Sequence, residues 1–504
     1  MLPLAAIDIG SNSVRLKIAR LVRHKLVTLA DEREVTRLGT SVFNTGMLDA
    51  VAMAQTVEVL KSYKKTIQKY GAGMVRAVAT SALRDARNGS VFREWIFNET
   101  GIRVEVISGL EEARLIHLGI SSQLGLGSGP SLLIDLGGGS CELTVSSGGN
   151  IHRTYSLPLG AVRLTEEFLL HDPPAKKEIR QLVAFIDEEL ERPARRIAGY
   201  KLTRALATSG TAAALSAVCS GKPRRSGPVP GDQVEKIFRK LLKMRERDRR
   251  KLEGIGPRRA EIIVAGAAVF TRLTEKCNLA SFQYCPLGLR DGLLAQMAAE
   301  FDELSPSRRQ IQSDRSFSLS HAMRRFQVDV DFATEVRRLA TELFQRLQRL
   351  HSLPPEYSQW LAAAAMLHEA GACVNRNGWQ RHSYYIIAHS DFLGYTPYER
   401  LLIASLARYL GSARPSSGHK TMKLLNTADQ KLIPRAVVLL RLARALNQTR
   451  TGMVRELAVR ISSEKVQIGL RTRRGRVDLE LWAAAKEAGY FRGIFGRELV
   501  VTEA

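Results

Sequence analysis

The sequence has few cysteines and no long apolar run, and each of these absences excludes some classes of protein. The 504 residues include 5 cysteines, and none of them forms a Cys-x-x-Cys pair. An odd number of scattered cysteines argues against a disulfide framework or a zinc site and favours a reducing compartment. No apolar run approaches the roughly 18 residues that span a bilayer. The N-terminal segment also lacks the basic region of a signal peptide, so we expect a cytoplasmic protein with no membrane partner.

Acidic residues are also in short supply. The chain has 75 Lys and Arg against 50 Asp and Glu, a formal net charge of +25. An excess of this size indicates a polyanionic partner, such as polyphosphate, a nucleotide or nucleic acid, although a solvated basic surface would have the same composition. Residues 371–450 alone carry 12 Lys and Arg against 3 Asp and Glu, a net +9. This segment could line a path for a long polyanion, whose binding would then depend on salt.

Strand-like apolar runs alternate with helical segments up to about Phe301, which predicts α/β layers. We expect strands at 4–9, 14–19, 75–79, 104–107, 131–134 and 205–207, a helix at about 83–99 and a loop at 221–231. Beyond Phe301 the strand signals vanish and helical spacing takes over, as in 332–350. We therefore predict four domains: two α/β lobes at 1–124 and 125–302, a helical domain at 303–448 and a small α/β segment at 449–504.

A nine-residue pattern occurs twice, 127 residues apart. DIGSNSVRL begins at Asp8 and DLGGGSCEL begins at Asp135, and each leads from an apolar run through a Gly turn into another run. A repeat at the spacing of a domain predicts two similar lobes that face one cleft. Glycine exposes backbone N–H groups that can bind phosphate oxygens, and hydroxyl and amide side chains add donors. The predicted phosphate contacts are Ser11, Asn12, Ser13, Gly137, Gly138, Gly139 and Ser140.

Acidic side chains stand at two further places in these motifs. Asp8 and Asp135 precede the turns and can hold Mg²⁺ directly or through water, because this cation binds beside phosphates through one or two carboxylates. Glu111 and Glu112 open the helix that follows SGLEEAR, where one acid can stabilise the helix dipole by about 0.3–1 kcal/mol. The other could be a general base that orients and deprotonates water. The residues alone do not decide which acid has which role.

Two more segments follow strand ends. Arg84 in TSALRDAR suits a bidentate phosphate contact, although an arginine on a helix surface is an equally good interpretation. Gly210 and Thr211 belong to a third Gly turn and are added to the candidate phosphate contacts.

Six motifs occur in the order found in the exopolyphosphatase/guanosine pentaphosphatase family: DIGSNSVRL, ATSALRDARN, ISGLEEARLI, IDLGGGSCEL, ATSGTAAAL and PLGLRDGLL. As a set they make the chain resemble that family over residues 4–295. The resemblance implies a two-lobed actin-like α/β fold of the sugar kinase and chaperone ATPase superfamily, with the active site between the lobes. It implies Glu112 as the catalytic base, Asp135 and Glu142 in Mg²⁺ binding and catalysis, and Arg84 as a phosphate contact. It also suggests a homodimer. Cys141 stands where the family usually has Thr, and we interpret it as a packing residue.

A weaker resemblance extends into the helical domain. LHEAG, which contains His368 and Glu369, and the later RHSY look like a degenerate HD-type phosphohydrolase domain. A working HD site needs His and Asp together on a metal. Here Glu369 follows His368, and the later Asp position is taken by Arg444 or Asn447. We therefore expect an all-α HD-like domain without a metal site of its own.

The combined prediction is an exopolyphosphatase that removes the terminal phosphate of inorganic polyphosphate by Mg²⁺-dependent in-line attack of water. Guanosine pentaphosphate 5′-phosphohydrolase activity is the nearest alternative, and the motifs do not separate the two substrates. A phosphotransferase of the sugar-kinase type fits less well, because the EEA motif suits water rather than a hydroxyl acceptor. A third alternative is a regulator that binds alarmone or polyanion without turnover, against which Glu112 and the intact turns argue. We do not expect a nucleic-acid partner.

Overall fold

The computed structural model describes residues 2–220, 227–302, 304–473 and 476–503. The chain forms two compact units, Met1–Asp314 and Arg315–Ala504. Within the described ranges no helix combines the length and the hydropathy of a membrane span. Residues 221–226 of the expected loop lie outside the described residues, and Pro228–Pro230 form the short strand β10.

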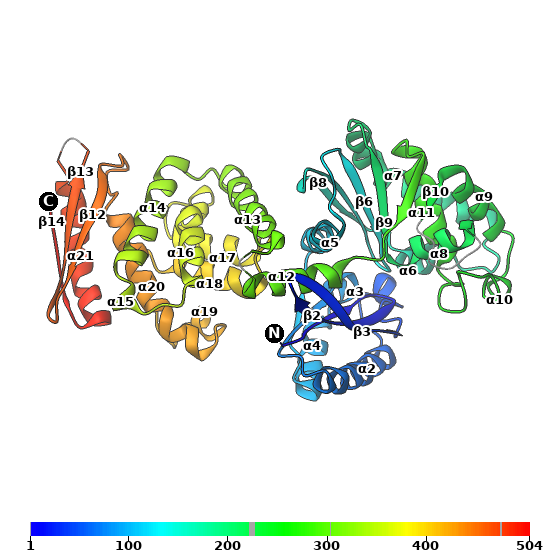
Figure 1. The fold of residues 1–504 in the computed structure, drawn as a ribbon, viewed down its shortest axis with the longest axis horizontal. Coiled ribbons are helices and arrows are strands. Elements are labelled where there is room, and N and C mark those ends of the chain that lie inside the picture. The colour runs from blue at the N-terminus through cyan, green and yellow to red at the C-terminus, as the bar shows by residue number, and fades with distance from the viewer. Residues whose placement is uncertain (1, 221–226, 303, 474–475, 504) are drawn as a thin grey trace. The chain divides into compact units, whose positions relative to one another are not determined.

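The first unit begins with a mixed sheet of strand order β3-β2-β1-β4-β5. Figure 1 labels its strands β2 and β3. Its strands are β1 (Leu4–Ile9), β2 (Ser13–Val22), β3 (Lys25–Val35), β4 (Met74–Ala79) and β5 (Val104–Val106). The helices of this lobe are α1 (Val42–Thr45), α2 (Ala50–Lys69), α3 (Ser81–Asp85), α4 (Gly89–Thr100) and α5 (Gly109–Leu124). β1 is buried along nearly its whole length, so it reads as a near-continuous apolar run rather than an alternating one.

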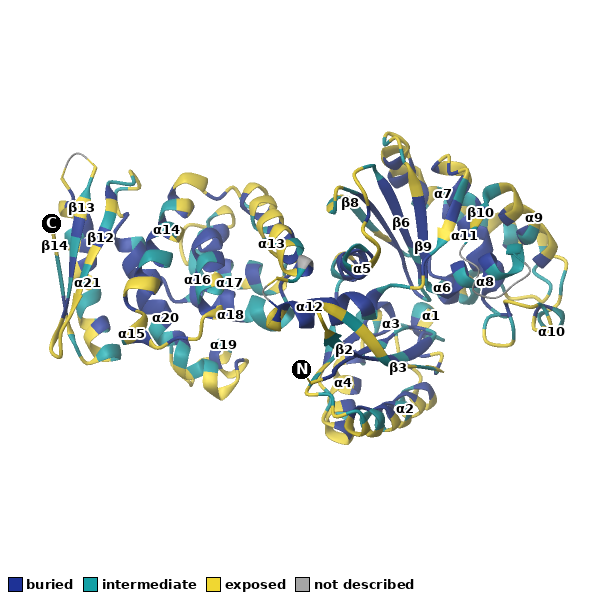
Figure 2. Ribbon diagram, in the orientation of Figure 1, coloured by how far each residue is buried: buried dark blue, intermediate teal, exposed yellow. Residues whose placement is uncertain are grey.

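A second sheet repeats this plan, with the order β10-β11-β9-β6-β7-β8. Its strands are β6 (Ser131–Leu136), β7 (Cys141–Ser147), β8 (Asn150–Leu157), β9 (Arg204–Thr208), β10 and β11 (Ser281–Tyr284). Apart from β10, the strands β6, β7, β8, β9 and β11 take the places of β1 to β5, and Figure 2 shows β6 and β9 as buried strands. The helices are α6 (Ala161–Phe168), α7 (Lys176–Ala198), α8 (Ser209–Ser220), α9 (Gly231–Leu241), α10 (Glu246–Arg249), α11 (Ile263–Lys276) and α12 (Leu289–Phe301).

The two Gly turns join the first two strands of each sheet. β1 pairs antiparallel with β2, and β6 pairs antiparallel with β7. On their other sides, β1 and β6 pair in parallel with β4 and β9. The turns therefore lie at the carboxyl ends of parallel strands, the edge at which α/β sheets bind ligands. This duplicated topology confirms the predicted two-lobed actin-like α/β fold.

Helix α12 fixes the position of α5, the helix that carries both candidate bases. A Cβ on Gly292 of α12 would lie 1.8 Å from the Leu115 carbonyl oxygen, and one on Gly119 of α5 would lie 2.6 Å from the Gly288 oxygen. The backbones of the two helices are so close that only glycine fits at both positions. The same region holds a hydrophobic cluster that joins Leu4, Val78, Leu133 and Leu206 of the two sheets with Leu293 of α12.

The second unit is helical over most of its length. Its helices are the end of α13 (Pro306–Arg325), then α14 (Val330–Arg346), α15 (Gln348–His351), α16 (Glu356–Leu367), the 3-10 helix η1 (Ala370–Cys373), α17 (Trp379–His389), α18 (Pro397–Arg408), α19 (Lys420–Lys423) and α20 (Thr427–Ala445). The described residues between β11 and Val454 contain no strand. Val336, Leu339 and Leu343 of α14 are buried, as the helical spacing predicts.

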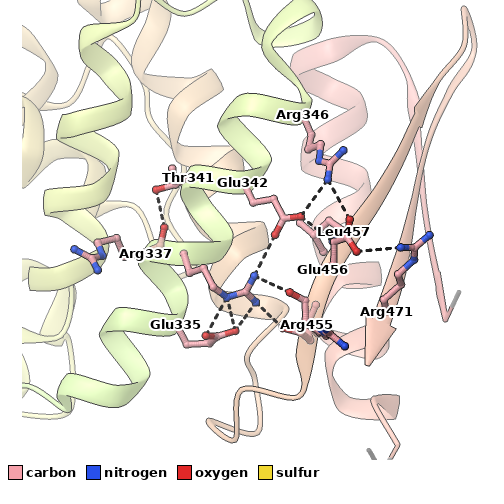
Figure 3. A network of polar contacts seen from close by, with 11 residues as sticks. Glu335, Arg337, Thr341, Glu342, Arg346, Arg455, Glu456, Leu457 and Arg471 are labelled. Atoms are coloured by element: carbon pink, nitrogen blue, oxygen red, sulfur yellow. Dashed lines mark hydrogen bonds and ion pairs between the residues drawn. The ribbon is translucent and has the colours of Figure 1, made fainter. Parts of the chain in front are cut away.

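A small sheet of order β12-β13-β14 ends the second unit. β12 is an edge strand, and side chains of α14 bind its backbone groups (Figure 3). Arg338 donates to the carbonyls of Val454 and Arg455 across 2.5 and 3.0 Å, and Glu342 accepts the Leu457 N–H across 2.9 Å. These contacts satisfy groups that an edge strand leaves open. The elements are β12 (Val454–Ile461), β13 (Lys465–Thr472), α21 (Asp478–Phe495) and β14 (Glu498–Glu503).

Candidate active site

The two Gly turns have the same backbone geometry. The Gly10 N–H donates to the Ser13 carbonyl across 3.1 Å, and the Gly137 N–H donates to the Ser140 carbonyl across 3.0 Å. A turn closed in this way holds the intervening peptide groups in a compact arrangement. The repeat seen in the sequence is therefore also a repeat of backbone structure.

The turns face each other closely. A Cβ on Gly138 would lie 3.0 Å from the Ser11 Cβ and 3.3 Å from the Asn12 nitrogen. One on Gly139 would lie 2.9 Å from Ser11 Oγ and 2.2 Å from Ser81 Oγ. The Ser11 and Ser81 hydroxyls are 3.0 Å apart. The structure thus brings the predicted residues of both turns together, and only glycine fits in the second turn where it meets the first.

A group of carboxylates lies beside the second turn. One oxygen from each of Glu112, Asp135 and Glu142 lies within 4.8 Å of the others. Asp8, at the equivalent position of the first hairpin, is close enough that its charge raises the pKa of Glu112 and Asp135. Oε2 of Glu112 and Oε2 of Glu142 are buried, and neither has a hydrogen-bond partner among the described residues. Buried carboxylate oxygens of like charge that lack hydrogen bonds are costly, so this donor set fits a hard divalent cation.

Burial is the main cause of raised pKa values throughout this group. Burial, and then the charge of Glu142, hold the pKa of Glu112 well above its usual range. Burial, and then Asp135, raise the pKa of Glu142 to about 8. Burial also raises the pKa of Asp135, and Thr208 partly offsets that rise by donating to Asp135 Oδ1 across 2.5 Å. Without a cation, the group disfavours full ionisation.

The structure separates the two acids at the start of α5. Ser108 caps the helix by accepting the Glu111 N–H at its Oγ, across 3.3 Å. The Glu111 carboxylate is bound by the fully buried Arg114, at 2.8 Å from both Nε and Nη2. The Glu112 carboxylate instead lies 3.6 Å from Nη1 of Arg84. Of the two, Glu112 belongs to the carboxylate group.

Arg84 and the third Gly turn are tied to the same region. Arg84 donates through Nη1 to the Ile107 carbonyl across 3.0 Å, which holds the guanidinium beside Glu112. The Ser209 hydroxyl donates to the carbonyl of Leu136, at the end of β6, across 2.7 Å. Gly210 follows directly, whereas the buried Thr211 packs its side chain against Gly266 of α11.

Three arginines that the motifs did not indicate gather near the first turn. Arg15 pairs across the sheet with Arg33, and Arg259 lies over Gly210, whose Cβ would meet its Nη2 at 1.3 Å. Burial, and then Arg15, lower the pKa of Arg33 to about 10, and burial, then Arg33 and Arg15, lower that of Arg259. Nε and Nη2 of Arg33 are buried and have no hydrogen-bond partner in the described part of the chain. Like charges held this close, with unpartnered donors, suit an anion.

Of these three arginines, one lies in a sequence motif that could have indicated its place at the site. Arg15 stands at the position of the first repeat that Glu142 occupies in the second, opposite Asp8 as Glu142 is opposite Asp135. Arg33 and Arg259 belong to no repeat, and only the fold brings them to the site.

In the HD-like motif of the second unit, Glu369 forms ion pairs instead of offering a free carboxylate. Oε1 of Glu369 lies 2.6 Å from Nη2 of Arg450 and 3.6 Å from Nη2 of Arg444. The buried His368 donates through Nδ1 to the Ala365 carbonyl across 2.7 Å. Two guanidinium groups thus take the carboxylate that a metal would need.

Residues 371–450 offer fewer unpaired cations at the surface than their net charge of +9 suggests. Several arginines of this segment pair with acids, and most of those acids lie outside it: Glu369, Glu487 and Asp329 bind Arg414, Arg441, Arg444 and Arg450. In the described part of the chain, the exposed cations of the segment without a carboxylate partner are Arg376, Arg381, Lys420, Lys423 and Lys431.

Known proteins share both the sequence and the fold of this chain. Residues 17–301 match the Ppx/GppA phosphatase family, and residues 315–480 match its domain III. The crystal structure of the Aquifex aeolicus member of the Ppx/GppA family is 32% identical, covers 60% of this chain and 99% of its own, and has a TM-score of 0.52. An exopolyphosphatase-like protein is 31% identical, covers 58% of this chain and 96% of its own, and has a TM-score of 0.55. An exopolyphosphatase from Cytophaga hutchinsonii, 24% identical, covers 59% of this chain and 98% of its own with a TM-score of 0.56, and it shows the fold alone.

Proposed function

The chain belongs to the Ppx/GppA phosphatase family, and from this premise we propose that it hydrolyses the terminal phosphoanhydride bond of inorganic polyphosphate. The observation that carries the proposal is the meeting of two equivalent Gly turns with a buried carboxylate group that contains Glu112. Turns of this kind suit phosphate oxygens, and a carboxylate beside them suits a water that attacks phosphorus.

Each residue has a role that follows from its place. The turns at 10–13 and 137–140 bind phosphate oxygens through N–H and hydroxyl groups. Arg84 steadies the terminal phosphate, and Glu112 orients a water in line with the bond that breaks and accepts its proton. Catalysis of this kind is mainly positioning and electrostatics, because phosphoryl transfer asks little covalent chemistry of the protein.

Asp8, Asp135 and Glu142 would hold Mg²⁺, and the unpartnered buried oxygen of Glu142 supports this assignment. The cation would supply positive charge for the phosphate oxygens and for the acids around it. Glu112 belongs to the same group of carboxylates, so its protonation depends on how far the cation would balance their negative charge.

The arginine group of Arg15, Arg33 and Arg259 supports a substrate with several phosphates. A single terminal phosphate at the turns leaves these cations without an anion, whereas a longer chain can reach them. Guanosine pentaphosphate remains the alternative substrate, because a nucleotide also carries phosphates beyond the one removed. A homodimer and a cytoplasmic location stay predictions.

Phosphate release from long-chain polyphosphate and from guanosine pentaphosphate, measured side by side in Mg²⁺, tests the proposal. Glu112→Gln should lower kcat by about 10²–10⁴-fold and leave polyphosphate binding nearly intact, because the loss concerns proton transfer. Glu58→Gln is the matched control, since Glu58 is exposed and forms its ion pair with Lys61 on the same helix. A higher kcat/KM on guanosine pentaphosphate would assign the alternative. Release from neither substrate by folded wild-type protein would refute both.

A further inference from the structure

The second Gly turn is bonded to the start of helix α6 through its carbonyl groups. The Ala161 N–H donates to the Gly137 carbonyl across 3.0 Å, and the Val162 N–H donates to the Gly138 carbonyl across 2.8 Å. In a planar trans peptide the C=O and N–H point in opposite directions. Fixing the carbonyls toward α6 therefore directs the N–H groups that follow them away from the start of α6.

The remaining carbonyl of this turn is bound by a side chain. Nε of Arg163, in the first turn of α6, donates to the Gly139 carbonyl across 2.8 Å. The same guanidinium forms an ion pair with Asp85 and lies over the ring of Phe43, 4.0 Å from its centroid. Asp85 and Phe43 belong to the first lobe, and Asp85 directly follows Arg84 in α3. One largely buried side chain thus contacts the second phosphate turn and the first lobe together.

We propose that Arg163 is a positioning residue that holds the second turn in its anion-binding conformation and ties this turn to the first lobe. The inference rests on the proposed function of the turns. Arg163 needs no contact with substrate for this role, because it acts on the carbonyl face of the turn. Through Asp85 it links the turn to the segment that carries Arg84, so that both sets of phosphate donors are in place at the same time.

Arg163 has two partners, the Gly139 carbonyl and the Asp85 carboxylate, and losing each of them should have a different effect. Loss of the bond to Gly139 should loosen the turn itself, whereas loss of the pair with Asp85 should affect only the link to the first lobe. A lysine at this position can donate to the carbonyl or pair with the carboxylate, but its single ammonium cannot reproduce the planar fork that does both.

The test compares Arg163→Met, Arg163→Lys and Asp85→Asn with the wild type. Arg195→Met is the control, because Arg195 is exposed and forms its ion pair with Glu191 on its own helix. Hydrogen exchange of the peptide that covers residues 137–144 reports on the turn without any turnover, and steady-state kinetics on long-chain polyphosphate report on function. Arg163→Met should speed exchange of this peptide, raise KM and lower kcat/KM by about 10–100-fold, the loss expected when a positioned group shifts by a fraction of an ångström to one ångström. Asp85→Asn should raise KM less and leave exchange at 137–144 as in the wild type, and Arg163→Lys should fall between.

Wild-type exchange and kinetics in a folded Arg163→Met protein would overturn the proposal. If that variant does not fold, wild-type values in both Arg163→Lys and Asp85→Asn would overturn it equally. A wild-type enzyme that releases no phosphate from polyphosphate would refute the proposed substrate instead, and exchange at 137–144 would still decide the role of Arg163.

Discussion

Glu111 and Glu112 are consecutive residues whose carboxylates have opposite surroundings. Arg114 binds Glu111 through two nitrogens at 2.8 Å, whereas Glu112 joins Asp135 and Glu142 within 4.8 Å. Consecutive positions on a helix are about 100° apart around its axis, so neighbours in sequence face different parts of the protein. One acid therefore compensates a buried cation, and the other faces the site.

Glu111→Gln should affect stability more than turnover. The change leaves the buried Arg114 without the charge of its main partner, and we expect the free energy of unfolding to fall by about 1–3 kcal/mol. Glu112→Gln should do the reverse, because it removes one of several acids that repel each other and also removes the proposed base. Urea unfolding and phosphate release measured on both variants check this division. If Glu111→Gln abolishes turnover in a fully stable protein, the two acids have been assigned in the wrong order.

Mg²⁺ should raise the Tm of the wild type, because a cation that binds only the folded carboxylate group stabilises it by mass action. Glu142→Gln should raise the Tm without Mg²⁺, since it relieves like-charge repulsion, and should shrink the shift that Mg²⁺ causes. Thermal unfolding in chelator and in Mg²⁺ measures both effects, with the exposed Glu188→Gln as control. Chelator should also stop phosphate release. An equal Mg²⁺ shift in Glu142→Gln and wild type would place the cation elsewhere.

Arg33→Met should stabilise the protein without substrate while weakening its grip on polyphosphate. The guanidinium is partly buried, has two unpartnered nitrogens and lies beside like charges, so its removal relieves a cost. With substrate bound, the same change removes charge-assisted hydrogen bonds, and we expect KM to rise about tenfold. Kinetics at low and moderate salt measure this. The control is Arg20→Met, an exposed arginine of the neighbouring strand. An unchanged KM would show that phosphates do not reach Arg33.

His117 should make the first unit less stable as the pH falls below neutrality. Its Nε2 lies 2.8 Å from Ser146 Oγ, and burial, then Arg114, lower its pKa from 6.5 to about 4. Between these values the unfolded chain binds the proton and the folded protein does not, so the free energy of unfolding falls as the pH falls. The full difference is up to about 3 kcal/mol. Urea unfolding of wild type and His117→Gln between pH 7 and pH 4, about the span of the two values, isolates this contribution as the difference in slope. Parallel slopes would show that His117 is protonated in the folded state.

Much of the fold around the site could be predicted from local sequence. The run at 4–9 became β1 (Leu4–Ile9), and the turns after Asp8 and Asp135 have the repeated geometry that their glycines predict. The expected helix at 83–99 is two helices, α3 and α4, because the chain is extended at Ala86. β3 was missed, since this edge strand is rich in charge and mostly exposed or half-buried, which hides the apolar run that marks a central strand.

The sequence by itself determined the duplicated hairpins, the family and the acids from which the site is built. These properties depend on spacing along the chain and on the chemistry of each residue type. Tertiary structure alone decided where each carboxylate of Glu111 and Glu112 lies, which cations remain unpaired and how the turns are held. Arg114 binds Glu111, and Arg163 links the second turn to Asp85. Acids from outside residues 371–450 pair with arginines of that segment. The contacts of Arg163 and of the arginines in that segment join side chains that are far apart in the sequence. The local pattern around a charged residue does not show which distant residue will pair with it.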